Sequence, residues 1–183
     1  MPKLIIGFTG LAGSGKDTAA NYLVTKGFRH TSLSNVVRSE ARRQLASTAR
    51  EKLIMIGNQL RNDYGPAVLA RKAMEKVAKA NRVVVTAIRN PSEVEYLRTC
   101  GTFILVNLTA NPEVRLLRLK RRGRKDEQHL TADELKRREK LEESRDPKAQ
   151  QLHKVIAMAD RVIDDNGSKE QLYARLDQFI AKF

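Results

Sequence analysis

Residues 10–18 decide the fold, and they have the sequence Gly10-Leu11-Ala12-Gly13-Ser14-Gly15-Lys16-Asp17-Thr18. They follow residues 3–9 (KLIIGFT), an apolar run typical of a buried strand, and they open a helical pattern over residues 16–26. Glycines at such a junction let successive backbone N–H groups curl around an anion, and the helix N-terminus adds partial positive charge. The alternative is a tight turn with an ordinary surface lysine, and the flanking elements make it the weaker interpretation. The stretch predicts a phosphate-binding loop.

Strands alternate with helices along the rest of the chain. Further apolar runs predict strands over residues 28–33, 82–88, 103–108 and 161–164. The helical patterns between them include an amphipathic helix over residues 34–46 and a charged helix from Thr131 to about Arg145. This alternation favours a three-layer α/β fold, in which helices cover both faces of a parallel five-stranded sheet.

The composition is that of a single globular domain spanning residues 1–183. Hydrophobic residues make up 41% of the 183-residue chain and charged residues 31%. The apolar runs are far shorter than the roughly 18 residues of a membrane span, and the start of the chain leaves no room for a signal peptide. Cys100 is the one cysteine, which excludes an intrachain disulfide. We expect a cytoplasmic protein without membrane contact.

The charge points to anionic partners. The net charge is +14, and residues 115–140 contain eleven Lys or Arg against five Asp or Glu. Phosphorylated metabolites and nucleic acid both fit this excess. The aromatic content of 5% and the absence of Trp give no sign of the stacking platforms of single-strand binders. The basic segment over about residues 123–146 follows the fourth strand, where a helical mobile lid is the favoured interpretation and a solvated helix pair the alternative.

The ending of the loop resembles one branch of the P-loop proteins. Lys16 is predicted to reach the β- and γ-phosphates of a nucleotide. Asp17 stands where a Ser or Thr usually follows this lysine, and Thr18 comes next. Such an ending resembles the adenylate kinase and (deoxy)nucleoside monophosphate kinase branch, whose members are often labelled AAA-family ATPases. The resemblance implies a P-loop NTPase fold with ATP and Mg²⁺ as cofactors. The ATP ligands would be Gly10, Ala12, Gly13, Ser14, Gly15, Lys16, Asp17 and Thr18.

The resemblance also implies an acceptor site. Residues 28–38 (FRHTSLSNVVR) are similar to a family stretch in which an arginine holds the acceptor phosphate, which would be Arg38 with Ser34 beside it. Residues 82–97 (RVVVTAIRNPSEVEYL) resemble the third strand and the arginine after it, which would be Arg89. Arg61 is a third candidate acceptor ligand, although a charged helix face explains it equally well. For Arg38 and Arg89, a role in ligand binding is favoured over an ordinary solvated surface position, because ligands bind at strand ends in open α/β sheets.

Two further segments complete the expected site. Residues 116–122 are similar to the helix that enters the family's lid, where arginines four residues apart clamp the transferring phosphate. Arg118 and Arg122 have this spacing, which makes them catalytic candidates with Lys16. Residues 159–168 look like the last strand and loop of dephospho-CoA kinases and small deoxynucleotide kinases. This similarity places Asn166 and Gly167 near the adenine of ATP.

One position departs from the family pattern. The third strand of the family normally ends in an Asp that orients the hydration shell of magnesium, and this chain has Thr86 there. Asp17 is the favoured replacement as the metal residue and Glu93 the second candidate. In a third alternative, ATP oxygens and water hold the ion.

The leading functional hypothesis is transfer of the ATP γ-phosphate to a small phosphorylated acceptor, above all a (deoxy)nucleoside monophosphate. A dephospho-CoA kinase is the nearest alternative enzyme, and it is disfavoured because residues 31–38 contain no Asp or Glu. An ATP-binding switch with little turnover and a nucleic-acid-associated ATPase are the alternatives from other classes. The expected partners are small-molecule nucleotides, with nucleic acid less favoured.

Overall fold

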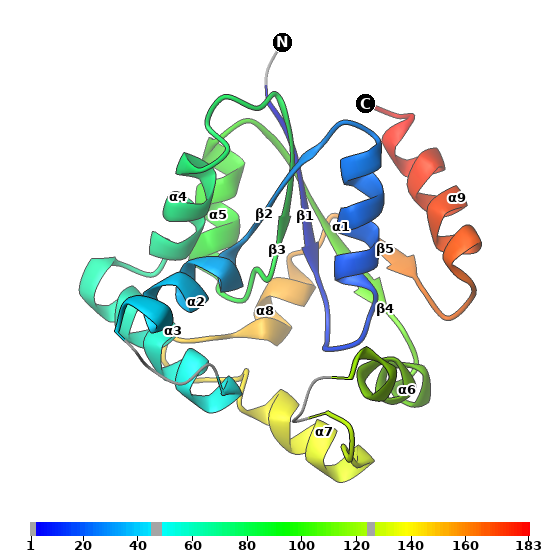
Figure 1. The fold of residues 1–183 in the computed structure, drawn as a ribbon. Coiled ribbons are helices and arrows are strands. Elements are labelled where there is room, and N and C mark those ends of the chain that lie inside the picture. Colours follow the sequence, from blue (N-terminus) through cyan, green and yellow to red (C-terminus); the bar gives the residue numbers. More distant parts are fainter. Residues whose placement is uncertain (1–2, 45–48, 124–126) are drawn as a thin grey trace.

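The computed structural model describes residues 3–44, 49–123 and 127–183. Its centre is a five-stranded parallel sheet in the order β2-β3-β1-β4-β5 (Figure 1). The strands are β1 (Leu4–Thr9), β2 (Arg29–Ser32), β3 (Arg82–Thr86), β4 (Thr102–Thr109) and β5 (Arg161–Asp164). The predicted α/β fold with a parallel five-stranded sheet is confirmed.

Helices cover both faces of the sheet, which gives the three layers. One face carries α1 and α9, and the other carries α2 to α5 and α8, while α6 and α7 lie at the end where the strands finish (Figure 1). The helices are α1 (Lys16–Thr25), α2 (Leu33–Arg43), α3 (Arg50–Tyr64), α4 (Val68–Glu75), α5 (Pro91–Thr99), α6 (Pro112–Arg122), α7 (Ala132–Lys140), α8 (Leu152–Ala157) and α9 (Lys169–Ile180). No helix within the described ranges is both long and apolar enough to cross a membrane.

The central strand β1 separates two apolar cores. Ile5 packs into the core under α2 to α5, whereas Ile6 and Phe8 pack into the core under α1 and α9. All three side chains are fully buried. Their alternation follows from the two-residue period of a strand, and burial on both faces explains why β1 has a continuous apolar sequence. This double packing fixes the phosphate loop, which begins directly after Thr9.

The expected helix over residues 34–46 ends at Arg43, and the third strand and the charged helix are also shorter than expected, each of these two for a tertiary reason. The third strand ends at Thr86 rather than residue 88, because Ala87 adopts a positive φ of 63° that turns the chain out of the sheet. The charged helix has its N-cap at Thr131, where the sequence predicts its start, but it ends at Lys140 rather than Arg145. Beyond it, Glu143 and Gln151 form an isolated antiparallel bridge, which draws the chain toward the sheet. Residues 45–46 of the expected 34–46 helix, and residues 124–126 of the expected lid, lie outside the described residues.

Candidate active site

The phosphate loop depends on glycines with left-handed backbone conformations. Gly10, Gly13 and Gly15 have φ values of 131°, 80° and 92°. A Cβ on Gly13 would lie 2.7 Å from the backbone oxygen of Arg115, and a Cβ on Gly15 would overlap the carboxylate of Asp165. Glycine is therefore required here by conformation and by space. The loop ends at Gly15, the N-cap of α1, so that the helix N-terminus faces the cleft.

Lys16 folds back onto its own loop. Its Nζ donates to the carbonyl oxygens of Gly10 (2.7 Å) and Leu11 (2.6 Å) and to Ser14 Oγ (3.2 Å). Burial, together with the nearby positive charge of Arg89, lowers the pKa of Lys16 to about 8. The lysine is thus held at the loop by neutral oxygens, which a phosphate oxygen would outcompete because it carries charge.

A single cleft of about 1650 Å³ extends from this loop to the ends of β2 and β3. Most of the site residues predicted from the sequence line it: Ala12, Gly13, Gly15, Lys16, Asp17, Thr18, Ser34, Arg38, Arg61, Arg89, Arg118, Arg122 and Gly167. Gly10, Ser14 and Asn166 do not line the cleft. The Gly10 carbonyl oxygen and Ser14 Oγ instead accept hydrogen bonds from Lys16 Nζ. Residues as far apart in the sequence as Ala12 and Gly167 therefore share one cavity.

Arg118 is locked against the phosphate loop by Asp165. Its Nη1 donates to Asp165 Oδ2 at 2.7 Å, and this carboxylate is buried against Gly15. Burial raises the pKa of the Asp165 carboxyl, and Arg118 acts in the opposite direction. The backbone N–H of Asp165 donates to the Thr109 oxygen at the end of β4, which fixes the loop after β5. Asn166 follows and accepts from the backbone N–H of Asn111.

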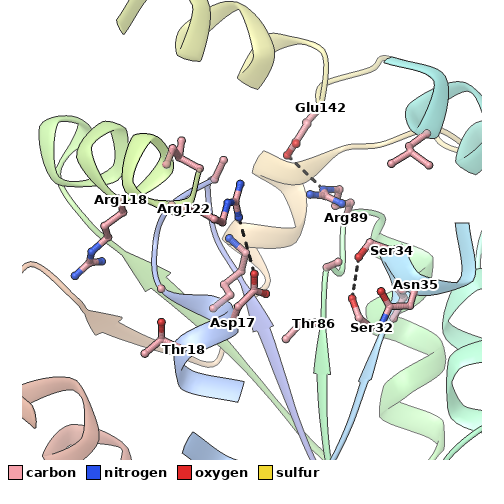
Figure 2. A pocket seen from close by; sticks show the side chains of 18 of the residues that line it. Asp17, Thr18, Ser32, Ser34, Asn35, Thr86, Arg89, Arg118, Arg122 and Glu142 are labelled. Carbon is pink, nitrogen blue, oxygen red and sulfur yellow. Dashed lines mark hydrogen bonds and ion pairs between the residues drawn. The ribbon is translucent and has the colours of Figure 1, made fainter. Parts of the chain in front are cut away.

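Arg122 lies one turn further along α6 and faces Asp17 across the cleft (Figure 2). The Arg122 guanidinium binds Glu127 through both Nε and Nη2, and its Nη1 lies 4.0 Å from Asp17 Oδ2. Arg118 and Arg122 both line the cleft. Their catalytic role stays a prediction.

Neutral polar groups lie at the end of β2. Ser32 Oγ and Ser34 Oγ are 3.0 Å apart, and Arg38 Nη1 donates to Ser34 Oγ at 3.2 Å. At the end of the adjacent β3, Thr86 Oγ1 lies 3.0 Å from the Nε2 atom of His30. Burial lowers the pKa of His30, which favours the neutral imidazole. This part of the cleft combines a guanidinium with hydroxyls.

Arg89 and Arg61 have different environments, although the sequence gives both the same role. The Arg89 side chain is 27% exposed, and its Nε donates to Glu142 Oε2 at 3.4 Å (Figure 2). The Arg61 side chain is 2% exposed, and its Nε and Nη2 both donate to Glu93 Oε1. The guanidinium of Arg61 is thus mostly occupied by a buried ion pair at the floor of the cleft. Its predicted acceptor role stays a prediction that this placement does not favour.

The buried ion pair of Arg61 and Glu93 argues against Glu93 as a magnesium ligand. Glu93 binds Arg61 through Oε1 and accepts from the backbone N–H groups of Arg89 and Asn90 through Oε2, so it has no oxygen to spare for a metal. Asp17 instead has a 70% exposed side chain beside the phosphate loop. Mg²⁺ commonly binds through one or two carboxylates plus phosphate oxygens and keeps several waters. Asp17 fits that requirement, and no group of three or more His, Cys, Asp or Glu that could hold a metal occurs within residues 3–44, 49–123 and 127–183.

Three carboxylates at the cleft were not predicted from the sequence: Glu127, Glu142 and Asp165. Each is nearly fully buried and pairs with one of the expected arginines. Asp165 directly follows a predicted strand, where the strand-end rule for ligand sites signals it. Glu127 and Glu142 lie in the charged segment, and only the tertiary structure distinguishes them from solvated neighbours.

The parallel sheet and its phosphate loop together define a P-loop protein of the kinase-like class. A family model described as an AAA domain matches residues 6–155, and the chain belongs to this family. Its relatives include UPF0200 proteins. The one from Methanothrix thermoacetophila is 36% identical over 141 residues, which are 75% of this chain and 78% of the relative. The one from Sulfurisphaera tokodaii is 29% identical over 180 residues, which are 97% and 96% of the two chains.

Solved structures share the whole fold. TT1252 from Thermus thermophilus superposes with a TM-score of 0.62 at 21% identity, covering 100% of this chain and 99% of that one. A shikimate kinase from Acinetobacter baumannii in complex with shikimate superposes with a TM-score of 0.58 at 20% identity, covering 97% and 93% of the two chains. At these identities the likeness establishes the fold and not the substrate.

Proposed function

We propose that the protein is an ATP-dependent phosphotransferase that moves the ATP γ-phosphate to a small phosphorylated acceptor, above all a (deoxy)nucleoside monophosphate. The single observation that carries this proposal is the shared cleft. The cleft contains a phosphate loop with Lys16 and, beyond the ends of β2 and β3, Arg38 and Arg89, which define its acceptor end. Two anions are thus accommodated in one cavity, which is the arrangement that transfer between two phosphates needs.

The chain's own residues would do most of the work by positioning and charge. ATP would bind through the backbone N–H groups of residues 10–18, and Lys16 would exchange its loop carbonyls for phosphate oxygens. Asp17 would hold Mg²⁺, which when bound neutralises charge on the β- and γ-phosphates. Arg118 and Arg122 would stabilise the transferring group from α6. Arg122 must first exchange Glu127 for phosphate, so we assign that step to closure of the lid.

The chemistry of the acceptor end favours an anionic acceptor over a neutral alcohol. A hydroxyl acceptor needs a base to take its proton, and the end of β2 offers Ser32 and Ser34 rather than a carboxylate. A phosphate acceptor is already an anion and needs guanidinium ligands instead. Arg38 and Arg89 provide that charge, and the apolar side chains of Val37, Leu53 and Ile54 line the same region, where they would contact the remainder of a nucleotide.

The testing experiment is ADP production from Mg-ATP across a panel of acceptors. The panel contains ribo- and deoxynucleoside monophosphates and dephospho-CoA, with uncharged nucleosides as neutral-alcohol probes and shikimate and gluconate as hydroxyl acceptors that carry a carboxylate. Strong stimulation by one nucleoside monophosphate, lost in Lys16→Ala, is the expected result. Stimulation by an alcohol alone, or ATP binding with no stimulation by any acceptor, would contradict the proposal. Circular dichroism of Lys16→Ala confirms that the blank is folded.

A further inference from the structure

The main chain and side chain of Arg89 are held at three points. Its backbone N–H donates to Glu93 Oε2 at 2.8 Å, and its backbone oxygen accepts from the N–H of Gln151 at 2.8 Å. Its side-chain Nε donates to Glu142 Oε2 at 3.4 Å. Within the described part of the chain, Nη1 and Nη2 of Arg89 contact no hydrogen-bond acceptor. The guanidinium is therefore held through Nε, and the 27% exposed side chain lines the cleft.

Glu142 is itself fixed by the backbone around it. Its carbonyl oxygen accepts from the N–H of Leu152 at 3.3 Å, and the adjacent Glu143 bridges Gln151. Gln151 in turn donates to the Arg89 oxygen. The segment after α7 and the loop after β3 thus form one short hydrogen-bonded unit that contains both partners of the ion pair. The Glu142 side chain lines the cleft and is only 4% exposed, so its position is restricted by packing.

Arg118 and Arg122, which also line the cleft, are held differently. Glu127 engages both Nε and Nη2 of Arg122, and Asp165 engages Nη1 of Arg118. In each of them a terminal nitrogen is occupied, whereas at Arg89 the carboxylate contacts Nε alone. An arginine fixed through Nε presents Nη1 and Nη2 as a ready pair of donors for two oxygens of one phosphate.

We propose that Glu142 is a positioning residue for the acceptor site, which orients Arg89 through Nε so that its Nη1 and Nη2 bind the acceptor phosphate. This inference rests on the proposed function and deepens it by adding a residue that links the segment after α7 to acceptor binding. Glu142 contacts no reacting atom. Because side-chain freedom restored to Arg89 must be lost again when phosphate binds, loss of Glu142 weakens acceptor binding.

The test compares Glu142→Gln with Glu143→Gln, its neighbour in the same bridged segment. The first readout is the Arg89 Nε–H signal in ¹H–¹⁵N NMR spectra, assigned by its disappearance in Arg89→Lys. We expect a signal protected from exchange in the wild type and in Glu143→Gln, and its loss or shift in Glu142→Gln. The remaining signals of the spectrum report whether each variant is folded.

The second readout is calorimetric titration of ADP-saturated protein with inorganic orthophosphate, since ADP blocks the phosphate loop. We expect the phosphate Kd to rise about tenfold in Glu142→Gln, as for loss of one charge-assisted hydrogen bond, and to stay within about twofold in Glu143→Gln. Equal or tighter phosphate binding by Glu142→Gln would overturn the positioning role and leave the proposed function standing. If the wild type binds no phosphate while the NMR signal still depends on Glu142, the phosphate-acceptor function is overturned and the orientation of Arg89 stands.

Discussion

The two ends of the cleft are built in different ways. At the ATP end, one continuous stretch supplies the loop, its lysine and the start of α1, and Lys16 bonds to residues no more than six positions away. At the acceptor end, Arg89 depends on Glu142, 53 positions further along, and Arg61 depends on Glu93, 32 positions further along. Local backbone conformation determines the first end, and long-range ion pairs determine the second. Their sensitivity to substitution should differ accordingly.

The largest expected effect on ATP binding is at the local end, for Gly15→Ala. The substitution forces an unfavourable φ of 92° and drives a Cβ into the Asp165 carboxylate, which distorts the loop. We expect ATP affinity to fall on the order of 100-fold, measured by calorimetry. Gly27→Ala is the matched control, because φ is 85° there but a Cβ meets nothing within 4 Å. It should cost about 1 kcal/mol of stability and leave ATP affinity unchanged. ATP binding by Gly15→Ala within threefold of the wild type would contradict this account.

At the acceptor end, Glu93→Ala should act on stability instead of ATP binding. The substitution leaves Arg61 buried without its carboxylate and removes an acceptor from the Arg89 and Asn90 N–H groups. We expect the free energy of unfolding in urea to fall by about 3–5 kcal/mol. Glu95→Ala, on an exposed position of the same helix, should change it by less than about 0.5 kcal/mol. Similar free energies of unfolding for the two variants would show that the Arg61–Glu93 pair does not stabilise the acceptor end.

The pH dependence of ATP binding tests the environment of Lys16 at the ATP end of the cleft. The pKa of Lys16 is about 8 in the empty loop, below its ordinary value of 10.5, and a bound phosphate favours the charged form. Binding therefore takes up a proton above pH 8, so affinity falls as pH rises through this pKa. We expect roughly tenfold weaker ATP binding at pH 9 than at pH 7. The dependence should vanish in Lys16→Met, and a flat wild-type profile would argue against a lowered pKa.

The same shift has the opposite sign for stability. The unfolded chain holds the Lys16 proton up to about pH 10.5, whereas the folded chain releases it near pH 8. Between these values the unfolded state binds more protons, so the contribution of Lys16 to stability improves as pH rises. Subtracting the unfolding profile of Lys16→Met from that of the wild type isolates this contribution. A difference profile that falls between pH 8 and pH 10 would refute the assignment.

The smallest effect is expected at the cap of α7. Thr131 Oγ1 accepts a hydrogen bond from the Glu134 backbone N–H, and Glu134 Oε2 accepts one from the Thr131 backbone N–H. Thr131→Ala should lower the local stability of this helix by about 1 kcal/mol, seen as roughly fivefold faster amide exchange in residues 132–140. Exchange in α1 serves as the internal reference. Faster exchange throughout the molecule would show that α7 is not an independent unit.

The predictability of each region follows from the range of its interactions. The five strands and the phosphate loop could be located from apolar runs and glycine spacing, because both signals are local. The end of the charged helix could not, since residues 141–145 have no helix-breaking residue and leave the helix for hydrogen bonds with Leu152 and Gln151. Likewise, the sequence offers both Arg61 and Arg89 as acceptor ligands and favours Arg89 only for its place after a strand; the buried ion pair of Arg61 with Glu93 is visible only in the tertiary structure.

The central claim is that the cleft joins two phosphates, and ³¹P NMR of the reaction product tests it most directly. With Mg-ATP and the acceptor that stimulates ADP release, the account predicts two equal sets of mutually coupled diphosphate signals, one from ADP and one from a phosphoanhydride on the acceptor, with loss of the acceptor's own phosphate-ester signal; none of these changes occurs in Lys16→Ala. An additional uncoupled phosphate-ester signal beside the signals of ADP would show transfer to a hydroxyl, and ADP with inorganic phosphate and an unchanged acceptor signal would show hydrolysis. Either of these results would contradict the account.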